Sequence, residues 1–71
     1  MSSQYKYSYF AEQLAVGIDR YAVGRIKNGG ENEYLTDHGG WSLDRKNARR
    51  FQQFYAKKEA KALFFNPDNQ R

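Results

Sequence analysis

The chain of 71 residues contains 12 lysines and arginines against 8 aspartates and glutamates, and it has no cysteine. This length allows one domain with a small core, and the lack of cysteine excludes disulfides and thiolate-bound metal as sources of extra stability. Aromatic residues make up 17% of the chain, so a few large rings must supply much of the buried surface.

Residues 1–10 form a polar segment in which tyrosine recurs at every second position. The segment lacks the charged start and apolar run of a signal peptide, and no stretch is long and apolar enough to span a membrane, which predicts a cytoplasmic protein. We assign residues 1–10 to a flexible arm that becomes ordered on a partner, with a frayed or edge strand as the alternative. The anchors of such an arm are Tyr5, Lys6, Tyr7, Tyr9 and Phe10.

Residues 8–16 have the pattern of a short helix. Ser8 is suited to cap its start, and Gly17 is suited to end it in the left-handed conformation. A helix of this length is unstable alone, so it must dock through the available contacts Phe10, Leu14 and Ile18.

Residues 18–27 are rich in β-branched and aromatic side chains, and they lead into Asn-Gly-Gly at 28–30. Asparagine and glycine tolerate positive φ, so this turn and the following residues 31–36 predict a β-hairpin. Gly24 interrupts the first strand, which indicates a bulge or the close approach of another element.

A second turn over residues 37–40 precedes Trp41, which begins a short third strand. A single tryptophan between a strand pair and a helix is typical of a core anchor between sheet and helix, with an exposed binding ring as the alternative.

Residues 44–65 have helical periodicity. The apolar stripe expected to face the core comprises Ala48, Phe51, Phe54, Tyr55, Ala62 and Phe65, and the opposite face carries Lys46, Arg50, Gln53, Lys57 and Lys61. One helix of this length is long for so small a domain. The alternative is a strand through residues 48–51 followed by a helix from about Gln53, with a short helical start before the strand.

These elements predict an α+β fold with an antiparallel sheet of two to three strands packed on one C-terminal amphipathic helix. Residues 11–66 form the single domain, because Pro67 ends the helix and residues 67–71 are a tail.

The residue types exclude most catalytic chemistry. His38 is the single histidine and cysteine is lacking, so Cys/His pairs and most zinc sites are excluded. The glycine pairs at 29–30 and 39–40 lack the Lys-Ser/Thr that follows a phosphate-binding loop. We therefore expect no enzyme activity, no cofactor and no metal.

Positive charge is concentrated in the second part of the chain. Residues 44–71 have eight basic and three acidic side chains, giving +5, whereas residues 1–43 have four and five, giving −1. Three interpretations remain open for the basic face: a solvated helix surface, a contact with an acidic protein surface, or a contact with nucleic acid. Its candidate contact residues are Lys46, Arg50, Lys57 and Lys61.

A strand pair containing Tyr34 and Leu35, followed by Gly40-Trp41 and then by Ala48-x-x-Phe51, resembles small phage-encoded proteins. Within that group, the size, the charge and the tyrosine-rich start are similar to the RNA-polymerase-binding regulators of Xanthomonas phages. The resemblance implies a monomer in the host cytoplasm that binds RNA polymerase and inhibits promoter-dependent initiation by competing with the sigma factor. It also implies antitermination. The alternatives are a small nucleic-acid-binding module and a structural or assembly accessory protein.

Overall fold

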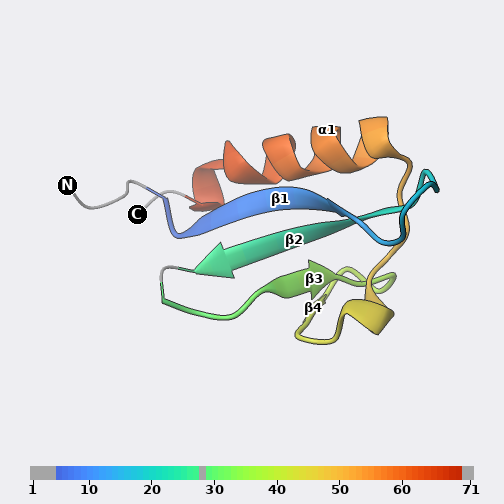
Figure 1. Ribbon diagram of the computed structural model, residues 1–71. Coiled ribbons are helices and arrows are strands. Elements are labelled where there is room, and N and C mark those ends of the chain that lie inside the picture. Colours follow the sequence, from blue (N-terminus) through green and yellow to red (C-terminus); the bar gives the residue numbers. More distant parts are fainter. Residues whose placement is uncertain (1–4, 28, 70–71) are drawn as a thin grey trace.

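The computed structural model describes residues 5–27 and 29–69, in which four strands and one α-helix form an α+β fold (Figure 1). The elements are β1 (Tyr7–Gln13), β2 (Tyr21–Lys27), β3 (Glu33–Leu35), β4 (Trp41–Ser42), the 3₁₀ turn η1 (Arg45–Asn47), α1 (Gln53–Phe64) and the 3₁₀ turn η2 (Pro67–Asn69). The predicted fold class is confirmed, with one more strand in the described residues than expected.

The additional strand is β1, which lies at one edge of an antiparallel sheet of order β1-β2-β3-β4. The helix expected over residues 8–16 is wrong, because Tyr7–Gln13 pair along their whole length with β2. Alternation explains the strand: Tyr9 and Ala11 pack on the α1 side of the sheet, and Phe10 packs on the other. The part of the expected arm from Tyr7 onward is thus an edge strand, and residues 1–4 lie outside the described residues.

The predicted hairpin is confirmed, since β2 pairs with β3 through Gly24 opposite Tyr34 and Arg25 opposite Glu33. In the turn between β2 and β3, Gly29 has a φ of +78° and the Gly30 amide donates a hydrogen bond to the Lys27 carbonyl at 2.7 Å. Residue 28 of the turn lies outside the described residues. The third strand predicted at residue 41 is also present, as β4.

The single helix over residues 44–65 is wrong, and the interrupted alternative is confirmed. Asp44 caps η1 by accepting a hydrogen bond from the Lys46 amide at 2.9 Å. Residues 48–51 then run extended, with Ala48 bridged to Thr36 and Phe51 bridged to Tyr21. The helix begins only at Gln53, because the backbone before it is committed to these strand partners.

The core has two layers, one on each side of the sheet. On the α1 side, a cluster of Val23, Ala56 and Ala60 is surrounded by partly buried Tyr9, Ala11, Tyr21, Leu35, Trp41, Phe51 and Leu63. On the other side, Ala22, Tyr34 and Ala48 pack with Phe10 and Leu14. Trp41 therefore packs against the cluster that joins sheet and helix, although it remains partly exposed.

The apolar stripe assigned to the helix is wrong for its helical part, although Ala48 and Phe51 do pack in the core from the extended segment before the helix. Phe54 is 69% exposed and Tyr55 and Phe65 are each 56% exposed, while the small Ala56 and Ala60 face the sheet. The stripe presupposed one continuous helix from Ala48, and the break before Gln53 removes that helical register.

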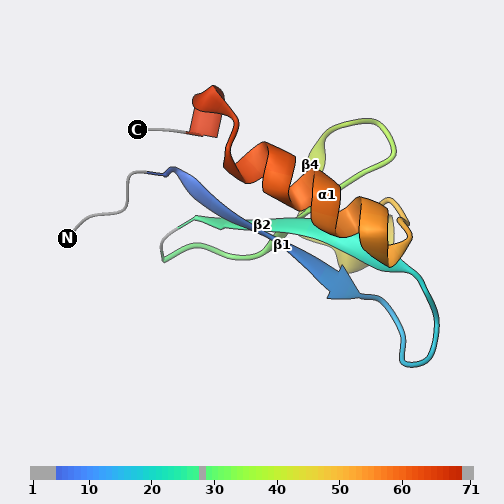
Figure 2. The ribbon, with the colours of Figure 1, turned by 90° about the horizontal axis from the view of Figure 1, so that it is seen from above.

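Figure 2 shows α1 lying obliquely over β2, with the C-terminal half of β1 lying clear of the helix. No helix in the described part of the chain is long and apolar enough to cross a membrane.

Candidate functional site

The extended residues 48–51 place two arginines on opposite sides of one strand-like segment. Their backbone is fixed by hydrogen bonds from the Arg49 amide to the Leu35 carbonyl and from the Phe51 amide to the Tyr21 carbonyl, both at 2.8 Å. Successive side chains of an extended chain point to opposite faces. Arg50 therefore shares the side of buried Ala48, and Arg49 shares the side of Phe51, over whose ring its guanidinium lies at 5.1 Å.

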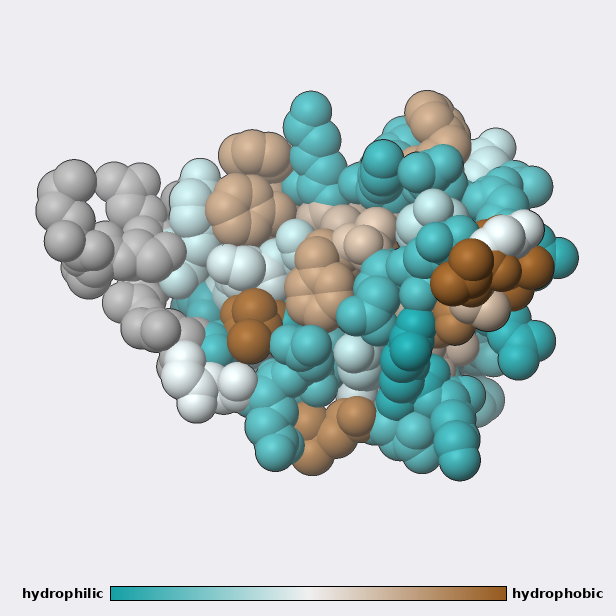
Figure 3. Space-filling model, in the orientation of Figure 1, coloured by the Kyte–Doolittle hydropathy of each residue, from teal (hydrophilic) through white to brown (hydrophobic). Residues whose placement is uncertain are grey.

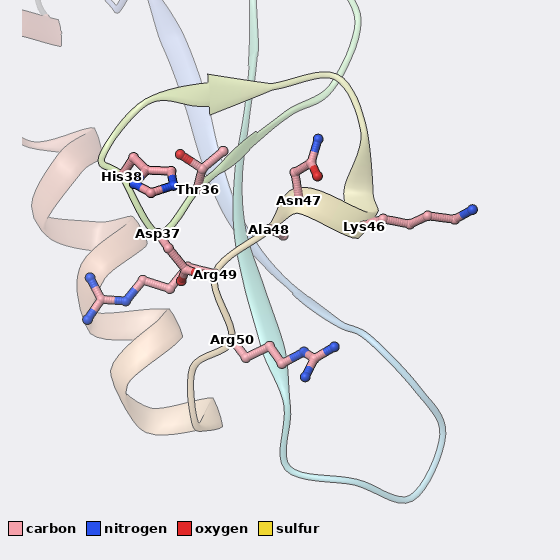
Figure 4. A pocket seen from close by; sticks show the side chains of 8 residues that line it. All are labelled: Thr36, Asp37, His38, Lys46, Asn47, Ala48, Arg49 and Arg50. Atoms are coloured by element: carbon pink, nitrogen blue, oxygen red, sulfur yellow. The ribbon is translucent and has the colours of Figure 1, made fainter.

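Three open hollows meet at this segment, and two of them contain Lys46. The first is lined by Thr36, Asp37, His38, Lys46, Asn47, Ala48, Arg49 and Arg50 (Figure 4). The second is lined by Leu14, Ala15, Ile18, Arg20, Asp44, Arg45, Lys46 and Arg50. Lys46 and Arg50 belong to both hollows. We define the basic patch as Arg20, Lys46, Arg49 and Arg50, all of which are exposed.

The cations of the basic patch do not converge on one point. Figure 4 shows Arg49 extending toward the side of α1, and Lys46 and Arg50 extending away from His38 and Thr36. A small anion needs several donors aimed at one position. The arrangement instead suits a broad acidic surface.

None of the four cations of the basic patch forms an ion pair among the described residues, although Asp37 and Asp44 each line one of the two hollows. The two ion pairs found there are Arg25–Glu33 at 2.8 Å and Arg45–Glu12 at 2.9 Å. Arg45 also donates to the Gln13 carbonyl at 2.6 Å, so it is bound to the sheet and is not counted in the patch.

Apolar side chains stand beside these cations. The loop between β1 and β2 exposes 98% of Val16 and 46% of Ile18, and Ile18 lines the second hollow. Figure 3 shows strongly apolar side chains among hydrophilic ones at this end of the molecule. Mixed apolar and charged surfaces of this kind are typical of protein interfaces.

The structure separates the predicted basic residues into two groups. Lys46 and Arg50 lie together in the basic patch, whereas Lys57 and Lys61 are exposed on α1. Sequence reasoning did not single out Arg20 as a contact residue. It joins Lys46 only through the tertiary fold, and no local pattern indicates this.

The predicted aromatic anchors are engaged with the domain. The ring of Tyr7 lies 4.2 Å from the Arg25 guanidinium, and Trp41 lies at the same distance from it. Tyr9 packs beside Trp41 at 5.9 Å, and Phe10 packs edge-on to Tyr34 at 6.3 Å.

The two residues before β1 contact the C-terminal part of the chain. Tyr5 stacks on Phe64 with 4.3 Å between ring centroids, and the Lys6 amide donates to the Asn69 carbonyl at 2.7 Å. None of the five residues predicted for the arm therefore lies on a separate tether.

Among the described residues, no group of three or more histidine, cysteine, aspartate or glutamate side chains is placed to hold a metal ion. Comparison of the chain with protein families, with curated proteins and with solved structures found no match. The fold and the basic patch together define a small α+β protein with an unneutralised cationic surface.

Proposed function

We propose that this protein is a non-catalytic docking module that binds an acidic surface of a partner protein through the basic patch. The observation that carries the proposal is the set of four exposed cations that lack an acidic partner among the described residues. Such a field speeds association with an acidic surface and orients the encounter. The adjacent Ile18 and Val16 supply apolar contact area that a nucleic-acid backbone does not use.

The partner that the sequence resemblance implies is host RNA polymerase. In this proposal the basic patch covers an acidic polymerase surface that the sigma factor also needs, and initiation at promoters falls because the two proteins compete. The extent of inhibition depends on the difference in affinity for polymerase with and without sigma. Antitermination belongs to the same proposal, as an effect of the module remaining on the elongating enzyme.

The test compares binding of immobilised bacterial RNA polymerase by two charge-reversed variants. Lys46→Glu combined with Arg50→Glu changes the basic patch, and Lys57→Glu combined with Lys61→Glu makes the same change of charge on α1. We expect the first pair to weaken binding at least about tenfold and the second to weaken it less. Equal effects of the two pairs, or no binding by the parent protein, would refute the docking mode.

Nucleic acid is the second candidate, because the same four cations can contact phosphates. The two hollows that contain Lys46 have no phenylalanine, tyrosine or tryptophan on which a base could stack, but Arg49 and Arg50 also line a third hollow with Phe51 and Tyr55. A salt titration of affinity for duplex and single-stranded DNA separates the candidates. Direct binding with a steep dependence on salt supports nucleic acid, and negligible binding supports a protein partner.

A further inference from the structure

Alternate residues of β1 direct their backbone amide and carbonyl groups to the outer edge of the sheet, away from β2. In an antiparallel pair, alternate residues exchange hydrogen bonds with the neighbour, and the residues between them direct their backbone groups away from it. Tyr21 of β2 exchanges bonds of 2.7 and 2.8 Å with Phe51, on the side of β2 opposite β1. Its partner in β1 is Gln13. The backbone groups of Gln13, and of every second residue before it, therefore point to the outer edge.

Both ends of this outer edge are closed by side chains. At Tyr7, the amide donates to Asn69 Oδ1 at 2.9 Å, and the carbonyl accepts from Asn69 Nδ2 at 3.0 Å. The Asn69 side chain, in a residue only 3% exposed, occupies the position that a strand partner would take. At Gln13, the carbonyl accepts from Arg45 Nη2 at 2.6 Å.

Between these closures lie Tyr9 and Ala11. Their two amides and two carbonyls have no partner among the described residues. Edge strands that avoid pairing carry lysine, proline or a bulge. β1 has none of these, and its one charged residue, Glu12, is paired with Arg45 on the sheet side away from α1. At Tyr9 and Ala11, the outer edge of β1 therefore has no feature that would prevent pairing with another strand.

The flank of α1 next to this edge is positively charged. Tyr55, Glu59 and Ala62 line a hollow with residues 49–52, which lie on the β3 side of β2. With Ala56 and Ala60 facing the sheet, Lys57 and Lys61 occupy the opposite flank, on the β1 side. Phe64 lies on that same flank, and its carbonyl accepts a hydrogen bond from the Asn69 side chain that closes the edge at Tyr7.

We propose that the outer edge of β1 binds an extended acidic segment of a partner protein as a further strand. The backbone of the segment pairs with Tyr9 and Ala11, and its acidic side chains on the α1 side meet Lys57 and Lys61. Strand addition of this kind takes affinity from main-chain hydrogen bonds and specificity from alternate side chains. A second copy of this chain fits less well, because two-fold pairing of β1 strands would bring the lysine flanks of both helices together.

The outer edge of β1 and the lysine flank contain no residue of the basic patch. This proposal can therefore be tested separately from the docking through the basic patch proposed above. The probe is a blocked hexapeptide of alternating glutamate and valine, titrated to millimolar concentration into the ¹⁵N-labelled protein. We expect the amide signals of Tyr9 and Ala11 to shift. A lysine–valine hexapeptide is the control, and its binding is expected to be at least about tenfold weaker.

Variants then assign the contacts. Lys57→Glu with Lys61→Glu should reduce peptide affinity about tenfold, whereas Lys46→Glu with Arg50→Glu should leave it nearly unchanged. Ala11→Pro removes one outward amide donor and should abolish the shift of the Tyr9 amide, with the signals of α1 reporting that the domain remains folded.

Three results would overturn the proposal. The first is the absence of shifts at Tyr9 and Ala11 at millimolar peptide. The second is loss of affinity through the Lys46 and Arg50 changes in place of the Lys57 and Lys61 changes. The third is a shift of the same two amides with protein concentration alone, which would show that a second copy occupies the edge.

Discussion

The Phe10 ring lies directly on Gly24 across the β1–β2 pair. A Cβ atom built at Gly24 would meet the ring at 2.3 Å from Phe10 Cζ and 2.4 Å from Phe10 Cε2. Any side chain at position 24 would therefore have to displace the Phe10 ring. The same ring meets Tyr34 edge-on, so it covers the sheet face that α1 leaves open.

Gly24→Ala should destabilise the protein by about 1–3 kcal/mol, because the ring must leave its position to admit the methyl group. Urea denaturation measures the change. Gly40→Ala is the matched control and should be close to neutral, since a Cβ there meets only Thr36 Oγ1 at 3.8 Å. An equal effect at both glycines would contradict this account.

Sequence reasoning identified Gly24 as a bulge or a close approach but could not choose between them. The clashing group comes from Phe10, in a segment that was assigned to an arm and a short helix. Identifying it needs the β1–β2 register, which local propensity does not specify. The same holds for Tyr7 and Trp41, whose rings both contact Arg25 only once all four strands are paired.

At the scale of elements, the sequence predicted the hairpin correctly because Asn-Gly-Gly allows few other conformations. It predicted the helix less well. Helical periodicity runs through residues 48–51, yet tertiary strand pairing with Thr36 and Tyr21 overrides it. With the helix beginning at Gln53, its buried side chains are the small Ala56 and Ala60 and not the large rings of Phe54 and Tyr55. The small side chains let the helix approach the sheet closely.

Substitutions on α1 distinguish the continuous helix over residues 44–65, which would bury Phe54, from the helix beginning at Gln53, which buries Ala56. Phe54→Ser should alter stability by no more than about 0.5 kcal/mol, because the ring is mostly exposed. Ala56→Val should cost about 1–3 kcal/mol, because it adds volume at a fully buried position against Val23. Urea midpoints of both variants test this. A larger loss of stability for Phe54→Ser than for Ala56→Val would support the apolar stripe first expected from the sequence.

At the scale of the whole molecule, the candidate site was predicted in part. Sequence reasoning placed Lys46 and Arg50 on one face of a helix; the two residues do line the same hollows, but from η1 and from the extended segment 48–51. Lys57 and Lys61 were grouped with them on a helix face that the break before Gln53 removes. Arg20 enters from a loop 26 positions before Lys46, and only the folded chain brings the two together.

The unneutralised charge of the basic patch should serve binding and not folding. Lys46→Glu with Arg50→Glu is therefore expected to leave the urea midpoint unchanged or to raise it slightly, since repulsion between the cations of the patch decreases. Arg45→Glu is the contrast and should lose about 1 kcal/mol or more, because it breaks the contacts with Glu12 and Gln13. A fall in stability in both cases would mean that the patch is structural.

The closure of β1 by Asn69 joins residues 62 positions apart. During translation, β1 leaves the ribosome long before Asn69 is made. The nascent chain therefore contains β1 without the Asn69 side chain that hydrogen-bonds to Tyr7 at its outer edge. Stalled or truncated chains that end before η2 would keep Tyr7 available for pairing as well as Tyr9 and Ala11. Such fragments should be the species most prone to assemble into β-rich aggregates, and a ribosome-release assay that follows their sedimentation would detect them.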